Sequence, residues 1–279
     1  MADTTFSKTF ERESETCLPR RDDGVADAAG LAPACAALLA RITAQPTRIH
    51  AITNAAAQVF TANLLLAAGA IPSLTHARDE VEAFTQRADA LLVNLGTLDE
   101  ERKIAIPRAM AAAHEAGRPV VLDPVFVDRS PPRLAFACEL LAAQPAILRC
   151  NAAEFEALTG ASANPDTLRG EASRRGCVIA LTGAVDFVTD GERFFEIRNG
   201  HPLMARITAM GCAGTALIAA FASREADTLI AASSALLALG IAGEIAGSRA
   251  AGPGSFQPAF LDALYALDGA TIAQSARTA

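Results

Sequence analysis

The sequence lacks the excess of positive charge and the uninterrupted apolar segments that mark several classes of protein. Its 24 Lys and Arg residues are outnumbered by 31 Asp and Glu, and the net charge of −7 argues against a nucleic-acid-binding surface. The longest apolar stretch, 229–245, is interrupted by Ser233, Ser234, Gly240 and Glu244. We therefore expect a buried helix there, and no membrane partner.

Paired cysteines and an apolar leader are also lacking. The six cysteines (Cys17, Cys35, Cys138, Cys150, Cys177 and Cys212) show no metal-like spacing, and no secretory signal supports disulfides. The first thirty residues are charged and contain no apolar block. We expect a flexible N-terminal tail over 1–30, a single domain over 31–270, a C-terminal tail over 271–279 and a cytoplasmic location.

What the sequence does contain is a series of short apolar runs, each of which ends in a polar residue or a glycine. The runs lie at 48–53, 89–96, 120–124, 146–149 and 177–183, and helical segments separate most of them. This pattern predicts an α/β fold with a mostly parallel central sheet and helices on both faces. A β-hairpin is predicted at 187–195, around Asp190-Gly191, and a last helix at 256–267 that Ser255 could cap.

Polar side chains stand at the ends of these predicted strands: Asn54, Asn94, Asp123, Arg149 and Thr182. The carboxyl ends of parallel strands lie at one edge of the sheet, where ligands bind. We therefore expect these side chains to gather at that edge, although they span more than a hundred residues of sequence. For Asn54, capping of a helix predicted at 55–68 is an equally good interpretation.

Cys212 stands where a loop (207–212) enters an apolar helix predicted at 213–221. Unpaired backbone N–H groups and the helix dipole favour negative charge at such a position, so we expect an anion cradle and a lowered thiol pKa. A buried thiol that merely caps the helix is the alternative. Together with an arginine and two carboxylates, the helix start suggests phosphoryl transfer from a nucleotide.

In order and spacing, these segments resemble the hydroxyethylthiazole kinases, ATP-dependent enzymes of thiamine salvage in the ribokinase-like superfamily. The resemblance covers about 35–268. It is carried by Ile52-Thr53-Asn54, Phe60-Thr61-Ala62-Asn63, Asn94-Leu95-Gly96-Thr97-Leu98, Leu122-Asp123-Pro124-Val125, Arg149-Cys150-Asn151-Ala152-Ala153-Glu154, Thr182-Gly183, Asn199-Gly200-His201, Gly211-Cys212 and Gly252-Pro253-Gly254-Ser255-Phe256. It implies a three-layer ribokinase-like domain that assembles as a homotrimer with active sites between subunits.

The resemblance also implies roles for individual residues. Cys212 takes the place of the superfamily's catalytic aspartate and would orient or deprotonate the acceptor alcohol. Arg149 and Thr182 would contact ATP, and Asp123 and Glu154 would hold Mg²⁺ directly or through water. The thiazole contacts would be Leu74, Ala209 and Asn54. The alternatives are a surface arginine for Arg149, turns for Thr182 and Asp123, and a first-turn helix acid for Glu154.

The sequence departs from the family pattern at two places. Ala209 and Met210 precede Gly211-Cys212 where relatives have a glycine and then threonine or alanine, and Phe126 and Asp128 stand where relatives have glycines. A glycine at position 209 could adopt a positive φ that alanine resists. The leading hypothesis is a kinase for 4-methyl-5-(2-hydroxyethyl)thiazole. The alternatives are a kinase for another small heterocyclic alcohol, an ATP-dependent hydro-lyase of the same fold, or a non-catalytic binder.

Overall fold

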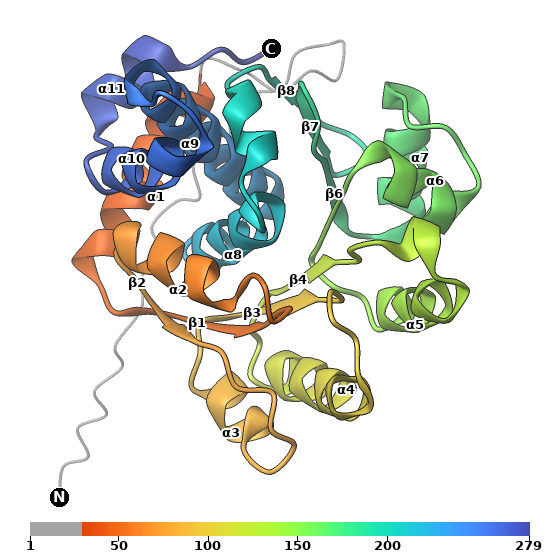
Figure 1. The fold of residues 1–279 in the computed structure, drawn as a ribbon. Coiled ribbons are helices and arrows are strands. Elements are labelled where there is room, and N and C mark those ends of the chain that lie inside the picture. The colour runs from red at the N-terminus through yellow and green to blue at the C-terminus, as the bar shows by residue number, and fades with distance from the viewer. Residues whose placement is uncertain (1–29) are drawn as a thin grey trace, which may run out of the picture.

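A computed structural model describes residues 30–279 as one three-layer α/β unit (Figure 1). Eight strands form a single sheet: β1 (Thr47–Ile52), β2 (Ala70–Ser73), β3 (Ala90–Asn94), β4 (Val120–Asp123), β5 (Ile147–Cys150), β6 (Val178–Leu181), β7 (Asp186–Thr189) and β8 (Phe194–Ile197). Their order across the sheet is β2-β1-β3-β4-β5-β6-β7-β8. The pairs are parallel from β2 to β6, and β7 and β8 are antiparallel. The predicted fold class is confirmed.

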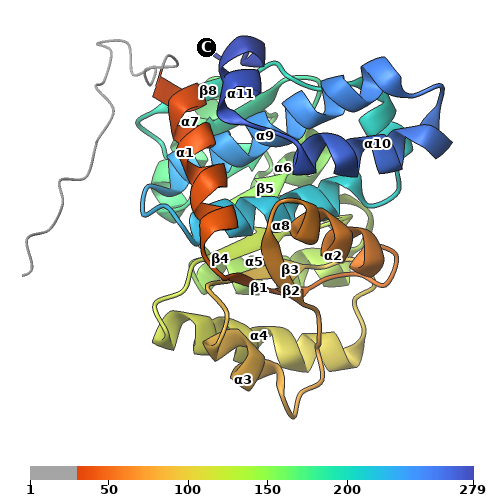
Figure 2. The same ribbon diagram turned by 90° about the vertical axis from the view of Figure 1, so that its left-hand side faces the viewer.

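Helices cover both faces of this sheet. One face carries α1 (Leu31–Ala44), α2 (Gln58–Ala67), α8 (Met210–Ala222), α9 (Thr228–Arg249), α10 (Pro253–Tyr265) and α11 (Gly269–Ser275). The other carries α3 (Val81–Gln86), α4 (Glu100–Glu115), α5 (Pro131–Ala142), α6 (Ala152–Thr159) and α7 (Pro165–Arg175). Figure 2 shows α3 and α4 on the side of the strands opposite to α2, α8 and α10. Short 3₁₀ turns, η2 (Val127–Arg129) and η3 (Pro202–Arg206), lie in two loops.

The apolar runs are strands because alternate residues have a hydrophobic layer to enter on each side. In β3, Leu92 packs into the core under α1, α2 and α8, whereas Leu91 and Val93 pack into the core under α3 to α7. Such burial on both faces produces continuous apolar runs in parallel sheets. The predicted hairpin is confirmed as β7 and β8, and its loop, 190–193, contains Gly191 at a φ of 102°.

Helix α9 is the apolar segment that was expected to be buried. It is long and apolar enough to cross a membrane by length and composition, yet 89% of its most hydrophobic window is buried inside the protein. It packs against α1, α8 and α10. Asp227 caps its start by accepting the backbone N–H groups of Leu229 and Ile230. The prediction of a buried core helix is confirmed.

Four local expectations need correction or comment. Helix α2 begins at Gln58 rather than 55, so Asn54 does not cap it. Helix α10 begins at Pro253, and the Ser255 hydroxyl lies inside its first turn, where it accepts the Ala251 N–H at 3.0 Å. The expected tail 271–279 contains most of α11, and Ala279 exchanges two backbone hydrogen bonds with Glu196 of β8. Residues 1–29 of the expected N-terminal tail lie outside the described residues.

Candidate functional site

Helix α8 begins at the carboxyl edge of the sheet, three residues earlier than its sequence suggested. Its first residue is Met210, and Ala209 precedes it with a φ of 66°, in the left-handed region. Alanine adopts this conformation at a cost of about 1 kcal/mol because its Cβ crowds the carbonyl oxygen. Cys212 lies in the first turn and is half-buried. The positive φ that a glycine could adopt at position 209 is thus present in the backbone, with alanine in place of glycine.

The predicted lowering of the Cys212 pKa is wrong. Burial raises the pKa of Cys212 to about 11, and the negative charge of Asp123 acts in the same direction. Hydrogen bonds from Asn94 and Asn54 and the charge of Arg149 lower it, but burial outweighs them. The thiol is therefore protonated at neutral pH.

Cys212 is connected to the strand ends by a row of amide side chains. The Asn54 Nδ2 lies 3.3 Å from the Cys212 Sγ and donates to the Asn94 Oδ1 at 3.0 Å. The Asn94 Nδ2 donates to the Asp123 Oδ2 at 2.9 Å, and the Thr215 hydroxyl of α8 lies 2.9 Å from the same oxygen. The ends of β1, β3 and β4 therefore meet the start of α8 through these contacts.

Arg149 lies on the other side of the same helix start. Its Nη1 is 3.5 Å from the Asp123 Oδ1, and only 15% of its side chain is exposed. Burial acts to lower the pKa of Arg149, but the carboxylates of Asp123 and Glu154 outweigh it and keep that pKa above its usual value. A Cβ added to Gly211 would fall 2.8 Å from the Arg149 Nη2, so the guanidinium packs directly on the first turn of α8.

A cavity of about 800 Å³ opens beside this guanidinium. Its walls include Arg149, Thr182, Asp186, His201, Met210 and Gly211. The size falls within the range of small-molecule sites. Cys212, Asn54, Asp123, Leu74 and Ala209 are not among its lining residues. The predicted ATP contacts therefore share one cavity, whereas Cys212 and the amide row lie across Gly211 from it.

Asp186 is a cavity residue that the sequence analysis missed. It begins β7 and accepts the Gly183 N–H at 2.9 Å. Burial raises the pKa of Asp186 to about 6, and the hydrogen bond from Gly183 and the charge of Arg149 oppose this shift. The signal in the sequence that could have identified Asp186 is its position four residues after Thr182, at the start of the antiparallel strand β7.

The two acidic residues predicted to hold a metal lie close enough to interact. Glu154 is 3% exposed; its Oε1 accepts the Phe126 N–H and its Oε2 the Asn151 N–H, each at 3.0 Å. Burial raises the pKa of Glu154, and the charge of Asp123 adds to this effect. Asp123 is completely buried, and its Oδ1 has no hydrogen-bond partner.

These carboxylates fit a water-mediated magnesium site better than a closed one. Over residues 30–279 no group of three or more His, Cys, Asp and Glu is placed to hold a metal. Mg²⁺ retains several waters and takes one or two carboxylates plus substrate phosphates, and the free Oδ1 of Asp123 can serve such a sphere. Phe126, at a position where glycine was expected, has a φ of 61° and is 56% exposed.

Leu74 follows β2 at the carboxyl edge and is half-buried against the core beneath α1 and α2. Strand β2 is an edge strand, and its Ile71 is exposed, as are Val59 and Leu66 of the neighbouring helix α2. Leu74 therefore borders an apolar surface instead of the cavity beside Arg149.

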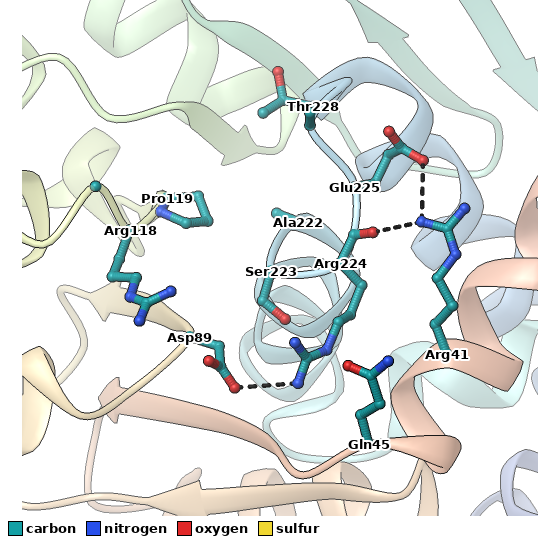
Figure 3. A pocket seen from close by; sticks show the side chains of 12 residues that line it. Arg41, Gln45, Asp89, Arg118, Pro119, Ala222, Ser223, Arg224, Glu225 and Thr228 are labelled. Atoms are coloured by element: carbon teal, nitrogen blue, oxygen red, sulfur yellow. Dashed lines mark hydrogen bonds and ion pairs between the residues drawn. The ribbon is translucent and has the colours of Figure 1, made fainter. Parts of the chain in front are cut away.

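A second hollow, of about 630 Å³, lies at the opposite, amino edge of the sheet (Figure 3). Arginines line it, but two of them are bound to the protein itself. Arg224 donates to the Thr47 hydroxyl and the Pro46 carbonyl at 2.8 Å and pairs with Asp89 at 3.2 Å. Arg41 donates to the Arg224 carbonyl at 2.9 Å. None of the predicted site residues lines this hollow, so we interpret it as structural.

Comparison with known proteins agrees with the geometry. The model of the Hydroxyethylthiazole kinase family matches residues 39–270. The chain is 48% identical over 242 residues to a hydroxyethylthiazole kinase of Granulibacter bethesdensis, a match that covers 82% of this chain and 88% of that protein. It is 46% identical over 230 residues to one from Klebsiella pneumoniae, with 78% and 89% covered.

Solved structures give the same result. The hydroxyethylthiazole kinase protein of Pyrococcus horikoshii OT3 superposes with a TM-score of 0.83 at 36% identity, over 88% of this chain and 98% of that one. A ribokinase-like superfamily protein of Enterococcus faecalis V583 superposes with a TM-score of 0.63 over 88% and 90% of the two chains. At 12% identity, the second match shows the fold alone.

Proposed function

We propose that this chain, which belongs to the hydroxyethylthiazole kinase family, phosphorylates the hydroxyl of 4-methyl-5-(2-hydroxyethyl)thiazole with ATP bound in the cavity beside Arg149. Cys212 would stand at the acceptor hydroxyl. The observation that carries this proposal is the position of Gly211-Cys212. The first residue contacts the guanidinium that borders the cavity, and the second contacts Asn54 on the other side. Donor and acceptor would then meet at the start of α8.

On the ATP side, Arg149 and the N-terminal end of α8 would supply positive charge to the phosphates. A planar guanidinium binds two phosphate oxygens at once, and a helix N-terminus favours anions. Thr182 would contact a phosphate from the end of β6. Phosphoryl transfer requires mainly positioning and neutralisation of charge, which these groups provide.

On the acceptor side, Cys212 would orient the alcohol by hydrogen bonding. Because the pKa of Cys212 is raised to about 11, only a small fraction is thiolate at neutral pH. The rate at which this thiolate removes the hydroxyl proton would therefore increase as pH rises, because the thiolate fraction increases. In a loose transition state the nucleophile needs little activation, so orientation by a neutral thiol supports the reaction. Asn54, Ala209 and Leu74 are the proposed contacts of the thiazole ring.

Mg²⁺ would be held by Asp123 and Glu154 through water, and would neutralise charge on the ATP phosphates when bound. This protein's own contribution is to keep the Asp123 Oδ1 free and to fix Glu154 by two backbone hydrogen bonds.

We also propose a homotrimer in which the thiazole site is completed by a neighbouring subunit. The support is the apolar surface of α2 and β2, where Val59 is 75% exposed and Leu66 56%. Leu74 lies at the end of β2, beside this surface. For the location we propose the cytoplasm, because the five cysteines of residues 30–279 are all unpaired, as in a reducing compartment.

A coupled assay of ADP release with a panel of heterocyclic alcohols tests the function. We expect the thiazole alcohol to be the best acceptor, and Cys212→Ser to lower kcat at least tenfold with Tm nearly unchanged. A different alcohol that is turned over far faster would favour the alternative kinase, which Ala209 at its positive φ motivates. Uptake of the thiazole without ADP release would indicate a binder.

A further inference from the structure

The row of amides that reaches Cys212 has a fixed hydrogen-bond direction at its Asp123 end. Asp123 faces the guanidinium of Arg149 at 3.5 Å, and its Oδ2 accepts hydrogen bonds from the Asn94 amide and from the Thr215 hydroxyl. The group of Asn94 that lies 2.9 Å from the Asp123 Oδ2 must therefore be its NH₂. Consequently, the Asn94 Oδ1 points away from Asp123.

A second contact fixes the same orientation independently. The backbone N–H of Gly96 donates to the Asn94 Oδ1 at 3.1 Å, and a backbone N–H can only donate. A flip of the Asn94 amide would therefore place its NH₂ against the Gly96 N–H, which are two donors. It would also place its Oδ1 against the carboxylate oxygen of Asp123, which are two acceptors. Because the Asn94 Oδ1 is an acceptor, the group of Asn54 that lies 3.0 Å from it must be its NH₂. The remaining hydrogen of that NH₂ is directed to the Cys212 Sγ at 3.3 Å.

The end of β3 packs closely against Asn54. A Cβ on Gly96 would fall 2.6 Å from the Asn54 Cβ and 2.8 Å from its Nδ2. The absence of a side chain at Gly96 therefore permits Asn54 to lie against the end of β3. Asn54 is 8% exposed and Asn94 is completely buried, so water does not compete for these bonds.

We propose that Asn94 is a positioning residue of the kinase: bound to Asp123 and to Asn54, it holds the amide N–H donors of this row against the Cys212 sulfur, and so fixes the direction of the thiol. This inference rests on the proposed role of Cys212 at the acceptor hydroxyl. Asn94 itself touches neither substrate. Because the Asn54 N–H is directed at the sulfur, the thiol hydrogen points away from the Asn54 amide.

The proposal is tested by the reactivity of Cys212 in the free enzyme. Alkylation by iodoacetamide at pH 9, followed by mass spectrometry of the peptide that contains Cys212, measures the thiolate without requiring turnover. We expect Asn94→Ala to slow this reaction about tenfold, since a hydrogen bond to a charged group is lost. We also expect kcat to fall about tenfold, with the KM for ATP unchanged.

Two further variants make the test specific. Asn54→Asp is nearly isosteric and replaces the N–H donor by an oxygen, so it must slow alkylation at least as much as Asn94→Ala. Thr215→Val removes the other hydrogen bond to the same Asp123 oxygen without touching Asn54, and alkylation should stay within twofold of the unsubstituted protein. This variant separates positioning from a general loss of packing.

The outcomes distinguish the inference from the proposed function. If Asn54→Asp slows alkylation and Asn94→Ala does not, Asn94 does not position Asn54 and the inference fails. If Thr215→Val slows alkylation as much as Asn94→Ala does, the effect is structural and the inference also fails. If no alcohol is phosphorylated although Asn94→Ala slows alkylation, the positioning role stands and the proposed function fails.

Discussion

Gly211 and Arg149 are in direct contact: the first turn of α8 approaches the guanidinium so closely that a Cβ at position 211 would fall 2.8 Å from Nη2 and 3.1 Å from Nη1. The guanidinium therefore lies in the space between α8 and the carboxylate of Asp123. Its location is set by an absent side chain on a different element of the fold.

Gly211→Ala should consequently weaken ATP binding without removing any charge. We expect the KM for ATP to rise about tenfold, equivalent to about 1.4 kcal/mol, because the guanidinium must move away from the phosphates. Arg149→Ala should raise it further and affect the KM for the thiazole less. Gly170→Ala, in α7 with nothing within 4 Å of its added Cβ, is the control. An unchanged KM for ATP in Gly211→Ala would contradict the assignment of this cavity.

Ala209→Gly should stabilise the protein, because a positive φ of 66° costs alanine more than glycine. We expect a gain of up to about 1 kcal/mol, or a rise in Tm of about 2 °C. The matched control is Ala213→Gly in the same helix, where glycine loses helix propensity and should lower Tm. Circular dichroism melts of both variants measure the difference. Equal destabilisation by both substitutions would show that the backbone at 209 is not strained.

Asp186→Asn should make stability less dependent on pH. Burial raises the pKa of Asp186 to about 6 in the folded protein, compared with about 3.9 in an unfolded chain. Folding thus favours the neutral form of the Asp186 carboxyl. The stability that this preference contributes to the folded protein is complete below about pH 4 and is lost as pH rises through about 6. Asparagine cannot ionise and keeps the acceptor for Gly183, so the variant should gain up to about 2 kcal/mol at pH 8 and little at pH 4.5.

Tm values of the free enzyme across this pH range check the prediction. Asp79→Asn, at a side chain that is 94% exposed, is the control for replacing a carboxylate by an amide outside a buried site. A difference for Asp186→Asn that does not grow with pH would contradict the raised pKa.

Arg224→Ala should destabilise the fold and leave the KM for ATP unchanged. It removes hydrogen bonds to Thr47 and Pro46 and leaves Asp89 without its arginine partner at the amino edge of the sheet (Figure 3). We expect a loss of about 2 kcal/mol, or about 6 °C in Tm. Arg78→Ala breaks a 3.9 Å pair that is largely exposed and should change Tm by less than 1 °C. A parallel rise in the KM for ATP in Arg224→Ala would show that the two edges of the sheet are coupled.

The sheet was largely predictable because a strand that is buried on both faces appears in the sequence as a continuous apolar run. The runs at 89–96, 120–124 and 177–183 correspond to β3, β4 and β6 to within a few residues. Strand β2 was not predicted: it has four residues, includes Pro72 and lies at an edge, so no periodicity marks it. The start of α2 was placed too early because the turn 55–57 is alanine-rich and reads as helix.

The site was predictable only in part. Parallel topology implied that Asn54, Asn94, Asp123 and Arg149 would meet, and the contacts among them follow from that topology. The sign of the Cys212 pKa shift was not predictable, because the helix dipole can be read from local sequence and burial cannot. Asp186 was missed because it comes from the antiparallel strand β7, outside the pattern of parallel strand ends.

Helix α9 has a consequence for how loss of stability is observed. Its apolar residues are covered only when α1, α8 and α10, from both ends of the described chain, have assembled around it. We expect that heating exposes this segment to water and lets it associate with other unfolded copies before the layers reassemble. Thermal inactivation would then be governed by an unfolding rate, so melts of different variants should be compared at one heating rate and one protein concentration.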